Sequence, residues 1–348
     1  MLVKNPGSVI AMQEPHSAPS QLLVSASPHV RSKETVSHIM WQVSAALAPA
    51  AVFGVFHFGI SALSTILVCI ASSVSCEAVV QKMTKQKSTI ADGSAVLSGF
   101  LLALCLPANI PWYMPALGSI VAIGVAKHMM GGLGYNVFNP AHIGRAFLMA
   151  SYPVAMTGYT MNNALGHAKS LLGNTDAVTT ATPLCILKLQ GYSALIEQFG
   201  GKTQLYKVML FGNHNGSIGE TSALLLIAGG IYLALRRYIK WQTPCIMIAT
   251  VGIGAWIFGG QNGLCHGDPI FHMMAGGLII GAFFMATDPV TVPMTKTGQM
   301  IFAFGAGVLT LLIRLVGGYP EGVCYALLLM NTLTPLIDKY IYPKKFGT

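Results

Sequence analysis

The stretch "TDAVTTATPL" at positions 175–184 is rich in hydroxyl groups, and its side chains are the first candidates for chemistry in this sequence. Asp176 and four threonines precede a proline in a chain that is otherwise mostly apolar. Three interpretations compete: a helix start with a hydroxyl or Asp as its cap, an anion-binding turn, and a site where a threonine oxygen is esterified to a phosphate. Because a threonine hydroxyl is a weak nucleophile without activation, the third would need a dedicated enzyme. The residues alone favour the helix start, since threonine-rich turns are common.

The composition indicates what kind of protein must position this stretch. Of the 348 residues, 53% are hydrophobic and only 9% are charged, whereas a soluble domain carries about 25% charged residues. The sequence therefore predicts an integral membrane protein. The formal net charge of +9 does not indicate a nucleic-acid partner, because the basic residues lie at the ends of apolar segments, where they orient a chain in lipid.

Ten apolar segments have the character of membrane-spanning helices, which need about 20 residues, or fewer when a span is short or broken. The sequence therefore predicts an all-α integral membrane fold. The segments are 39–58, 60–80, 94–107, 111–130, 140–156, 221–237, 242–258, 270–287, 299–316 and 322–337.

The positions of Lys and Arg orient these segments. Arg31 and Lys33 precede the first segment, and each later basic cluster falls on the same side if the N-terminus is cytoplasmic. The basic residues of the long loop between the fifth and sixth segments lie on the other face, but long loops escape this rule. The predicted parts are a cytoplasmic arm (1–38), a first membrane half (39–156), an extracytoplasmic loop (157–220), a second membrane half (221–337) and a cytoplasmic tail (338–348).

Five segments on each side of the loop predict two inverted five-helix repeats, because an odd number of spans per half turns the second half over. The third segment opens after Asp92 and the eighth after Asp268, and both are rich in Gly, Ala and Leu. Short or interrupted spans at matching positions of two halves mark the functional centre of several transporter folds. Asp92 and Asp268 are therefore candidates for an ion pathway, and the capping of helix N-termini is their alternative role.

The stretch at 175–184 resembles the flavinylation motif D-x-x-[ST]-[GAS]-A-T, in which the last threonine accepts FMN through its phosphate. Asp176, Thr179, Ala181 and Thr182 match it, and Thr180 stands where the motif has a small residue. Nearly everything after residue 27 resembles the RnfD proteins of the Rnf electron-transport complexes and, more distantly, the NqrB proteins of the sodium-pumping NADH:quinone reductases. The segments that carry this resemblance are "SPHVRS" (27–32), "DGSAVLSGFLLALCLP" (92–107), "GGLGYNVFNPAHIGRAF" (131–147) and "ATDPVTVPMTKTGQ" (286–299).

The resemblance implies a redox carrier in the inner membrane of a bacterial cell, with FMN joined to Thr182 on the extracytoplasmic side by a separate flavin transferase. Such a subunit is not catalytic alone. It relays electrons in a ferredoxin:NAD oxidoreductase complex and helps couple them to Na⁺ or H⁺ transport. The implied partners are membrane iron–sulfur subunits, another flavin-bearing subunit, cytoplasmic subunits that react with ferredoxin and NAD, and membrane lipid. A second, non-covalent flavin such as riboflavin is an expectation from the distant relative.

A few polar residues near the predicted spans are candidates for holding such a cofactor. Asn136, Asn139 and His142 lie at a span boundary and could hydrogen-bond a flavin or water, and turn chemistry is their alternative role. Arg314 lies near the outer end of the ninth span, against the orientation trend, and could stabilise an anionic flavin or a phosphate. Arg145 lies inside the fifth span, where an ionisable residue is a functional candidate, although it could also extend to the cytoplasmic interface.

Several motifs are absent from the sequence. It holds no P-loop, no C-x-x-C pair and no G-x-G-x-x-G placed between a strand and a helix. We therefore expect no NAD, ATP, metal ion or iron–sulfur cluster bound by this chain alone. Three other functions stay open: a secondary transporter with inverted repeats and no flavin, a protein like NqrB of the NADH:quinone reductases, and a scaffold protein without a redox role.

Overall fold

Apolar helices build almost the whole of the structure, as the composition predicts. The computed structural model describes residues 34–85, 88–160, 179–212, 214–260 and 263–342. Within these ranges, three helices are long and apolar enough to cross a membrane, namely α1 (Val36–Phe58), α2 (Ile60–Met83) and α14 (Lys296–Leu315). Three shorter helices are also apolar: α3 (Ser94–Leu104), α10 (Ala223–Leu235) and α11 (Gln242–Phe258). The predicted all-α class is confirmed, whereas the count of ten spans and the inverted repeat stay predictions.

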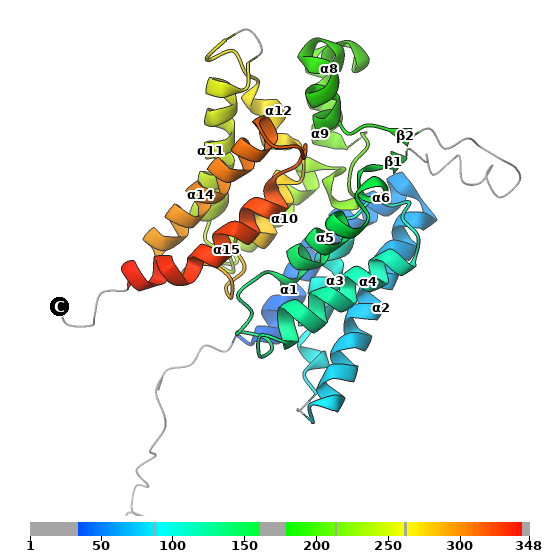
Figure 1. The fold of residues 1–348 in the computed structure, drawn as a ribbon, viewed down its shortest axis with the longest axis vertical. Helices are drawn as coiled ribbons and strands as arrows, with labels where there is room; N and C mark the ends of the chain where they lie inside the picture. The colour runs from blue at the N-terminus through cyan, green and yellow to red at the C-terminus, as the bar shows by residue number, and fades with distance from the viewer. Residues whose placement is uncertain (1–33, 86–87, 161–178, 213, 261–262, 343–348) are drawn as a thin grey trace, which may run out of the picture. The chain divides into compact units, whose positions relative to one another are not determined.

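The first group of helices runs from α1 to α6 (Figure 1). After α3 come α4 (Tyr113–Val121), the π-helical turn η2 (Ala122–His128), α5 (Pro140–Ser151) and α6 (Pro153–Thr157). A 3-10 turn, η1 (Ile90–Asp92), leads into α3. Helix α2 packs along α3 and α4, and α5 packs on α3, α4 and η2. Each predicted span of this half thus overlaps a helix, with the fourth and fifth made of two pieces.

The connection between the two groups forms a small layer of its own. It contains the paired strands β1 (Tyr159–Thr160) and β2 (Thr179–Thr180), helices α8 (Pro183–Gln198) and α9 (Lys202–Phe211), and the 3-10 turn η3 (Ile218–Glu220). The strands are antiparallel, with Tyr159 opposite Thr180. Figure 1 shows α8 and α9 near the strands at one end of the helices. A separate apolar core joins α8 and α9 to α12 (Pro269–Met274) through Leu184, Ile186, Leu195, Leu205, Met209, Phe271 and Ala275.

The second group consists of α10, α11, α12, α13 (Leu278–Ile280), the π-helical turn η4 (Gly281–Met285), α14 and α15 (Val323–Tyr340). Helices α11, α14 and α15 pack side by side, and the two groups meet where α1 contacts α10 and α5 contacts α15 (Figure 1). The first contact needs glycine, because a Cβ atom added at Gly229 would lie 2.4 Å from the Ala46 carbonyl oxygen. Small residues that let backbones approach closely are typical of helix contacts in membranes.

The eighth predicted span is broken. Helix α12 ends at Met274, and Gly276 and Gly277 both adopt left-handed backbone angles, with φ of 67° and 65°, before α13 begins. A break inside an apolar bundle leaves backbone carbonyl groups that need partners. The guanidinium of Arg314, on α14, donates to the carbonyl oxygens of His272, Ala275 and Gly276 at 2.6, 2.6 and 3.3 Å. Arg314 therefore stabilises the end of a broken helix.

Candidate cofactor site around Thr182

Thr182 is the N-cap of α8. This agrees with the first interpretation of the stretch, a helix start with a hydroxyl or Asp as its cap. Pro183 follows as the first helical residue, and Thr182 has φ −64° and ψ 154°, the extended backbone that a residue before proline favours. The Thr182 hydroxyl oxygen accepts a hydrogen bond from the Cys185 N–H at 3.3 Å, and the residue is only 5% exposed. Asp176 lies outside the described residues. Thr179 pairs with Thr160 in the two-stranded ladder, and the exposed Ala181 links this ladder to α8.

Thr182 lies on the wall of a cavity of about 240 Å³. The other walls come from α5, from β1 and from the segment that leads into α15. They combine apolar groups with tyrosines and one ion pair, and the residues that matter below are Arg145, Tyr159, Cys185, Tyr319, Glu321 and Tyr325. We call this the outer cavity. Three tyrosines and an arginine beside one hydroxyl make a suitable setting for a planar aromatic group that carries negative charge.

A buried ion pair forms one side of the outer cavity. The guanidinium of Arg145 donates to the carboxylate of Glu321, and the Tyr159 hydroxyl donates to the same carboxylate at 3.1 Å. Burial and the neighbouring Glu321 raise the pKa of Tyr159, so this phenol stays a neutral donor. Nε of Arg145 has no hydrogen-bond partner among the described residues. Arg145 thus joins α5 to the segment before α15, rather than extending to the cytoplasmic surface.

Thr182 also borders a second, much smaller cavity of about 10 Å³. Its other polar walls are His214, Asn215, Glu220 and Glu321. Within the part of the chain that the structure describes, buried atoms of three of these residues lack hydrogen-bond partners: His214 Nδ1, Asn215 Oδ1 and Glu220 Oε1. Burial lowers the pKa of His214 to about 4, so its imidazole is neutral at pH 7. Unpartnered buried polar atoms around a cavity of this size are suited to a bound water molecule.

Arg314 does not line either of these cavities. Its terminal nitrogens hold the carbonyl groups of the broken α12, and only Nε lacks a partner among the described residues. The structure therefore places Arg145, not Arg314, in the wall of the cavity that Thr182 lines.

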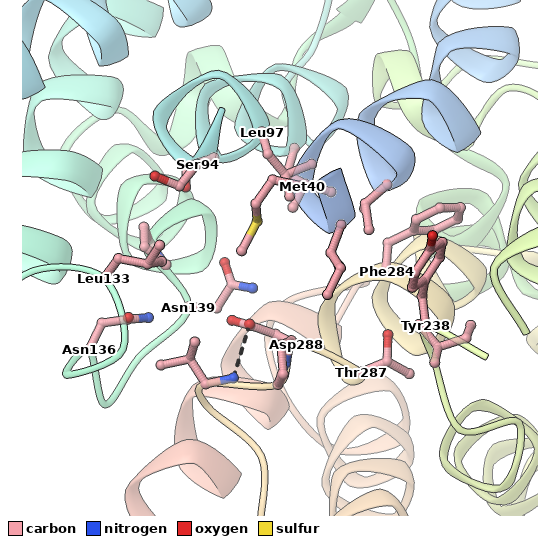
Figure 2. A pocket seen from close by; sticks show the side chains of 18 of the residues that line it. Met40, Ser94, Leu97, Leu133, Asn136, Asn139, Tyr238, Phe284, Thr287 and Asp288 are labelled. Atoms are coloured by element: carbon pink, nitrogen blue, oxygen red, sulfur yellow. Dashed lines mark hydrogen bonds between the residues drawn. The ribbon is translucent and has the colours of Figure 1, made fainter. Parts of the chain in front are cut away.

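A third cavity, of about 160 Å³, lies between both helix groups at their other end, and we call it the inner pocket (Figure 2). Asn136, Asn139 and Asp288 lie on one side of it, and Tyr238 and Phe284 on the other. Asn139 caps α5 by accepting the Ala141 N–H at 3.0 Å. Asn136 donates to the Phe138 carbonyl oxygen at 3.2 Å, and its own side-chain oxygen has no partner among the described residues.

A second buried ion pair borders the inner pocket. The Lys127 ammonium, which lines the pocket, donates to Glu77 at 2.8 Å and to the Ser94 hydroxyl at 2.6 Å. Gln81 donates to the same Glu77 oxygen at 3.0 Å. His142 is buried on α5, between Asn139 of the inner pocket and Arg145 of the outer cavity. Neither of its ring nitrogens has a hydrogen-bond partner among the described residues, and it lines none of the three cavities.

The two aspartates proposed for an ion pathway both hold local structure. Asp268 accepts the Phe271 N–H at 3.2 Å at the start of α12, and it also accepts the hydroxyls of Tyr192 and Tyr206, which belong to α8 and α9. Burial first, and then the hydrogen bond to this carboxylate, raise the pKa of both tyrosines. Asp92 accepts the N–H and the hydroxyl of Ser94 at 2.8 and 2.6 Å. Neither lines one of the three cavities.

Sequence reasoning missed several residues around Thr182: Tyr159, Tyr319, Glu321 and Tyr325 of the outer cavity, and Glu220 of the small cavity. Two of them carry a local signal. Ser217 and Glu220 form a capping box, which the spacing S-x-x-E just before an apolar run indicates. Glu321 is an acidic residue in the short "GGYPEG" connection between two apolar segments. Its pairing with Arg145, 176 positions earlier, depends on the tertiary fold.

Comparison with known proteins gives the family. Residues 23–347 match the model of the NQR2, RnfD, RnfE family. The chain is 63% identical over 325 residues to the D subunit of the proton-translocating ferredoxin:NAD(+) oxidoreductase complex of Clostridium ljungdahlii, covering 93% of this chain and 96% of the relative. It is 43% identical to the D subunit of the Na(+)-translocating ferredoxin:NAD(+) oxidoreductase complex of Acetobacterium woodii, over 94% and 95% of the two chains.

A third relative, the D subunit of the ion-translocating oxidoreductase complex of Stutzerimonas stutzeri, is 39% identical, and the match covers 90% of this chain and 93% of the relative. The chain therefore belongs to the NQR2, RnfD, RnfE family, and with its apolar helices it is a membrane protein. The predicted resemblance is confirmed.

Proposed function

We propose that this chain is a membrane subunit of an ion-translocating ferredoxin:NAD oxidoreductase complex, and that it carries FMN esterified through its phosphate to Thr182. The names of the three relatives support the complex. The observation that carries the cofactor is that Thr182 borders a cavity of about 240 Å³ with Arg145 and three tyrosines on its walls. A bound flavin supplies the reversible uptake of electrons, and the protein's part is to hold and tune it.

The residues around Thr182 fit such a group. Thr182 begins α8, and the N-terminal end of a helix carries partial positive charge that favours a phosphate. Arg145 supplies a positive charge, which the Glu321 carboxylate partly offsets, and has one nitrogen without a partner among the described residues. Tyr159, Tyr319 and Tyr325 supply apolar ring faces with hydroxyls that can donate. These groups orient a planar anionic ligand and reduce its contact with water.

The orientation in the membrane is also a proposal. The placement of Lys and Arg supports cytoplasmic termini and an extracytoplasmic position for 157–220, in the inner membrane of a bacterial cell. A flavin transferase would then meet Thr182 on the outer face. Reporter fusions at Gly200 and Gly347 test this arrangement, and activity on the same side of the membrane for both fusions would contradict it.

We further propose that the inner pocket holds a second, non-covalent flavin such as riboflavin. Apolar walls with the two amides of Asn136 and Asn139 support this, because amides can donate to and accept from the polar edge of a flavin. The coupling ion is Na⁺ or H⁺, since the relatives are named for both ions. Asp92 and Asp268 stay candidates for its pathway. Membrane iron–sulfur subunits, a second flavin-bearing subunit and cytoplasmic subunits that react with ferredoxin and NAD are the proposed partners.

The covalent flavin is tested by the fluorescence of the denatured chain in a gel. Thr182→Val is roughly isosteric and removes the acceptor hydroxyl, so we expect membrane insertion with no fluorescence. Thr180→Ala is the matched control and should keep its fluorescence, because small residues fit that place of the motif. Asp176→Ala should reduce loading without abolishing it. Bright fluorescence of purified Thr182→Val would refute the assignment, and a dark unmodified chain made with an active transferase would favour a transporter without flavin.

A further inference from the structure

A cavity of about 10 Å³ connects Thr182 to a buried carboxyl group, Glu220. This volume is about that needed for one water molecule. Its floor is the break between α12 and α13, where Ala275 and Gly276 line it. Thr182 and Glu220 therefore line one cavity with room for about one water molecule, next to the break of the eighth predicted span.

One oxygen of Glu220 is held and the other is not. Oε2 accepts the Ser217 N–H at 3.4 Å within the capping box of η3. Oε1 has no hydrogen-bond partner among the described residues. It lies against the helix break, because a Cβ atom added at Gly277 would be 2.7 Å from it. The residue is only 8% exposed. A buried carboxylate with an unpartnered oxygen is costly, and binding a proton or a hydrogen-bonding water relieves that cost.

The charged and titratable groups that face Glu220 come from several elements: Glu321 before α15, Arg145 on α5, Arg314 on α14, Tyr159 in β1, Cys105 after α3 and His214 before η3. Burial first, and then Glu321, raise the pKa of Glu220 to about 8, while Arg145 opposes this rise. Tyr159 has a raised pKa and His214 a pKa of about 4, so both stay neutral between pH 6 and pH 9.

We propose that, at alkaline pH, Glu220 is the carboxyl group that binds a proton when an electron is placed on the flavin at Thr182, through the small cavity that both residues line. This inference rests on the proposed covalent flavin. The electron adds one negative charge beside the cavity, and a neighbouring negative charge favours the neutral form of a carboxyl group. The electron comes from a redox partner of the proposed complex and the proton from solvent. Glu220 changes from carboxylate to carboxylic acid, so the local net charge is unchanged.

The test uses the full chain in its complex, with the pH dependence of the potential of the flavin's first one-electron step as the readout. At pH 6 to 7 Glu220 is neutral, and Glu220→Gln should have nearly the same potential as the unmodified protein. Above about pH 8 the equilibrium constant for adding the electron should fall by up to tenfold per pH unit in the unmodified protein. This corresponds to a fall in the reduction potential of about 59 mV per pH unit for one electron. Glu220→Gln should not show this fall.

Two further variants control this measurement. Glu197→Gln removes an exposed carboxylate from α8, and its flavin potential should show the same pH dependence as that of the unmodified protein. Glu220→Asp keeps a titratable carboxyl and should keep a fall in potential at alkaline pH, which makes the test possible if Glu220→Gln folds poorly. Parallel curves for the unmodified protein, Glu220→Gln and Glu220→Asp would overturn the proposal.

A second readout needs no flavin. In the Thr182→Val background, the unfolding temperature is compared with and without Glu220→Gln. The folded-state pKa of about 8 lies above the unfolded value of about 4.3, so the stability that Glu220 contributes is complete below that unfolded value. As pH rises to about 8 this contribution should be lost, so the unfolding temperature should fall relative to that of the protein with Glu220→Gln. A difference in unfolding temperature between the two proteins that stays constant across this pH range would overturn the inference about Glu220 alone. Absence of covalent flavin from the unmodified chain would overturn the proposed function as well.

Discussion

Two buried ion pairs each border a cavity, but they join different parts of the molecule. Arg145 and Glu321 lie beside the outer cavity and connect α5 to the segment before α15, 176 positions away. Lys127 and Glu77 lie beside the inner pocket and connect η2 to α2, 50 positions away. The outer pair therefore links the two helix groups, whereas the inner pair stabilises the first group alone.

The same helix serves both regions. Asn139 caps α5 and lines the inner pocket, and Arg145, six residues later, lines the outer cavity. Six residues of α-helix correspond to about 9 Å along the axis. The difference between the regions lies in how they are supported. The inner pair has Gln81 and Ser94 as additional hydrogen-bond partners from nearby elements, whereas the outer pair has Tyr159. The outer cavity thus depends more on contacts between distant parts of the chain.

The largest effect is expected from removing one partner of either pair. Arg145→Met and Lys127→Met should each destabilise the fold by about 3–5 kcal/mol, because each leaves an uncompensated buried charge. The two variants should differ in the flavin at Thr182. Only Arg145→Met should lower its reduction potential, because a positive charge has been removed beside it. Thermal unfolding of the purified protein and a redox titration measure the two effects.

Two controls sharpen this comparison. Arg145→Met combined with Glu321→Gln removes both charges, so it should recover much of the lost stability and return the flavin potential toward that of the unmodified protein. Lys207→Met removes an exposed charge from α9 and should change stability by less than about 0.5 kcal/mol. An equal shift of the flavin potential in Arg145→Met and Lys127→Met would contradict the separation of the two regions.

The sequence predicts the helices better than the cavities, for a physical reason. Apolar length and the cap before Pro183 are local signals, and they place all ten apolar segments on helices and Thr182 at the start of α8. The break after Met274 and the role of Arg314 depend on contacts between α12 and α14 that no local pattern contains. For the same reason the sequence suggests an anionic ligand for Arg314 and does not indicate a partner for Arg145.

A smaller effect is expected at the inner pocket, where a variant should release the non-covalent flavin but not the covalent one. Asn139→Asp keeps the helix cap, since Asp and Asn cap equally well, but it removes two N–H donors from the pocket. We expect release of non-covalent flavin with unchanged covalent fluorescence, and a loss of stability because the variant places a carboxylate at a buried position. Asn139→Ala adds no charge and should cost about 1 kcal/mol through the lost cap. Flavin in the supernatant of acid-precipitated protein reports the non-covalent fraction, and full retention in both variants would argue against a flavin in this pocket.

The smallest effect is expected from asparagine at the two aspartates. Asp268→Asn can still cap α12, so stability should change by less than about 0.5 kcal/mol, whereas Asp268→Ala should cost about 1–2 kcal/mol through the cap and the tyrosine hydrogen bonds. Asp92→Asn should be similarly mild. Ion transport and electron transfer measured in parallel decide their second role. A larger fall in transport than in electron transfer would assign the residue to the ion pathway, and unchanged coupling would leave it as a cap.

The central claim is that Thr182 carries FMN, and peptide mass spectrometry tests it most directly. The chain is purified from cells with an active flavin transferase and digested, and the peptide that spans 175–184 is fragmented. The account predicts one FMN joined through a phosphoester to Thr182, with Thr179 and Thr180 unmodified. An unmodified peptide, or an adduct on Thr179 or Thr180, would contradict it.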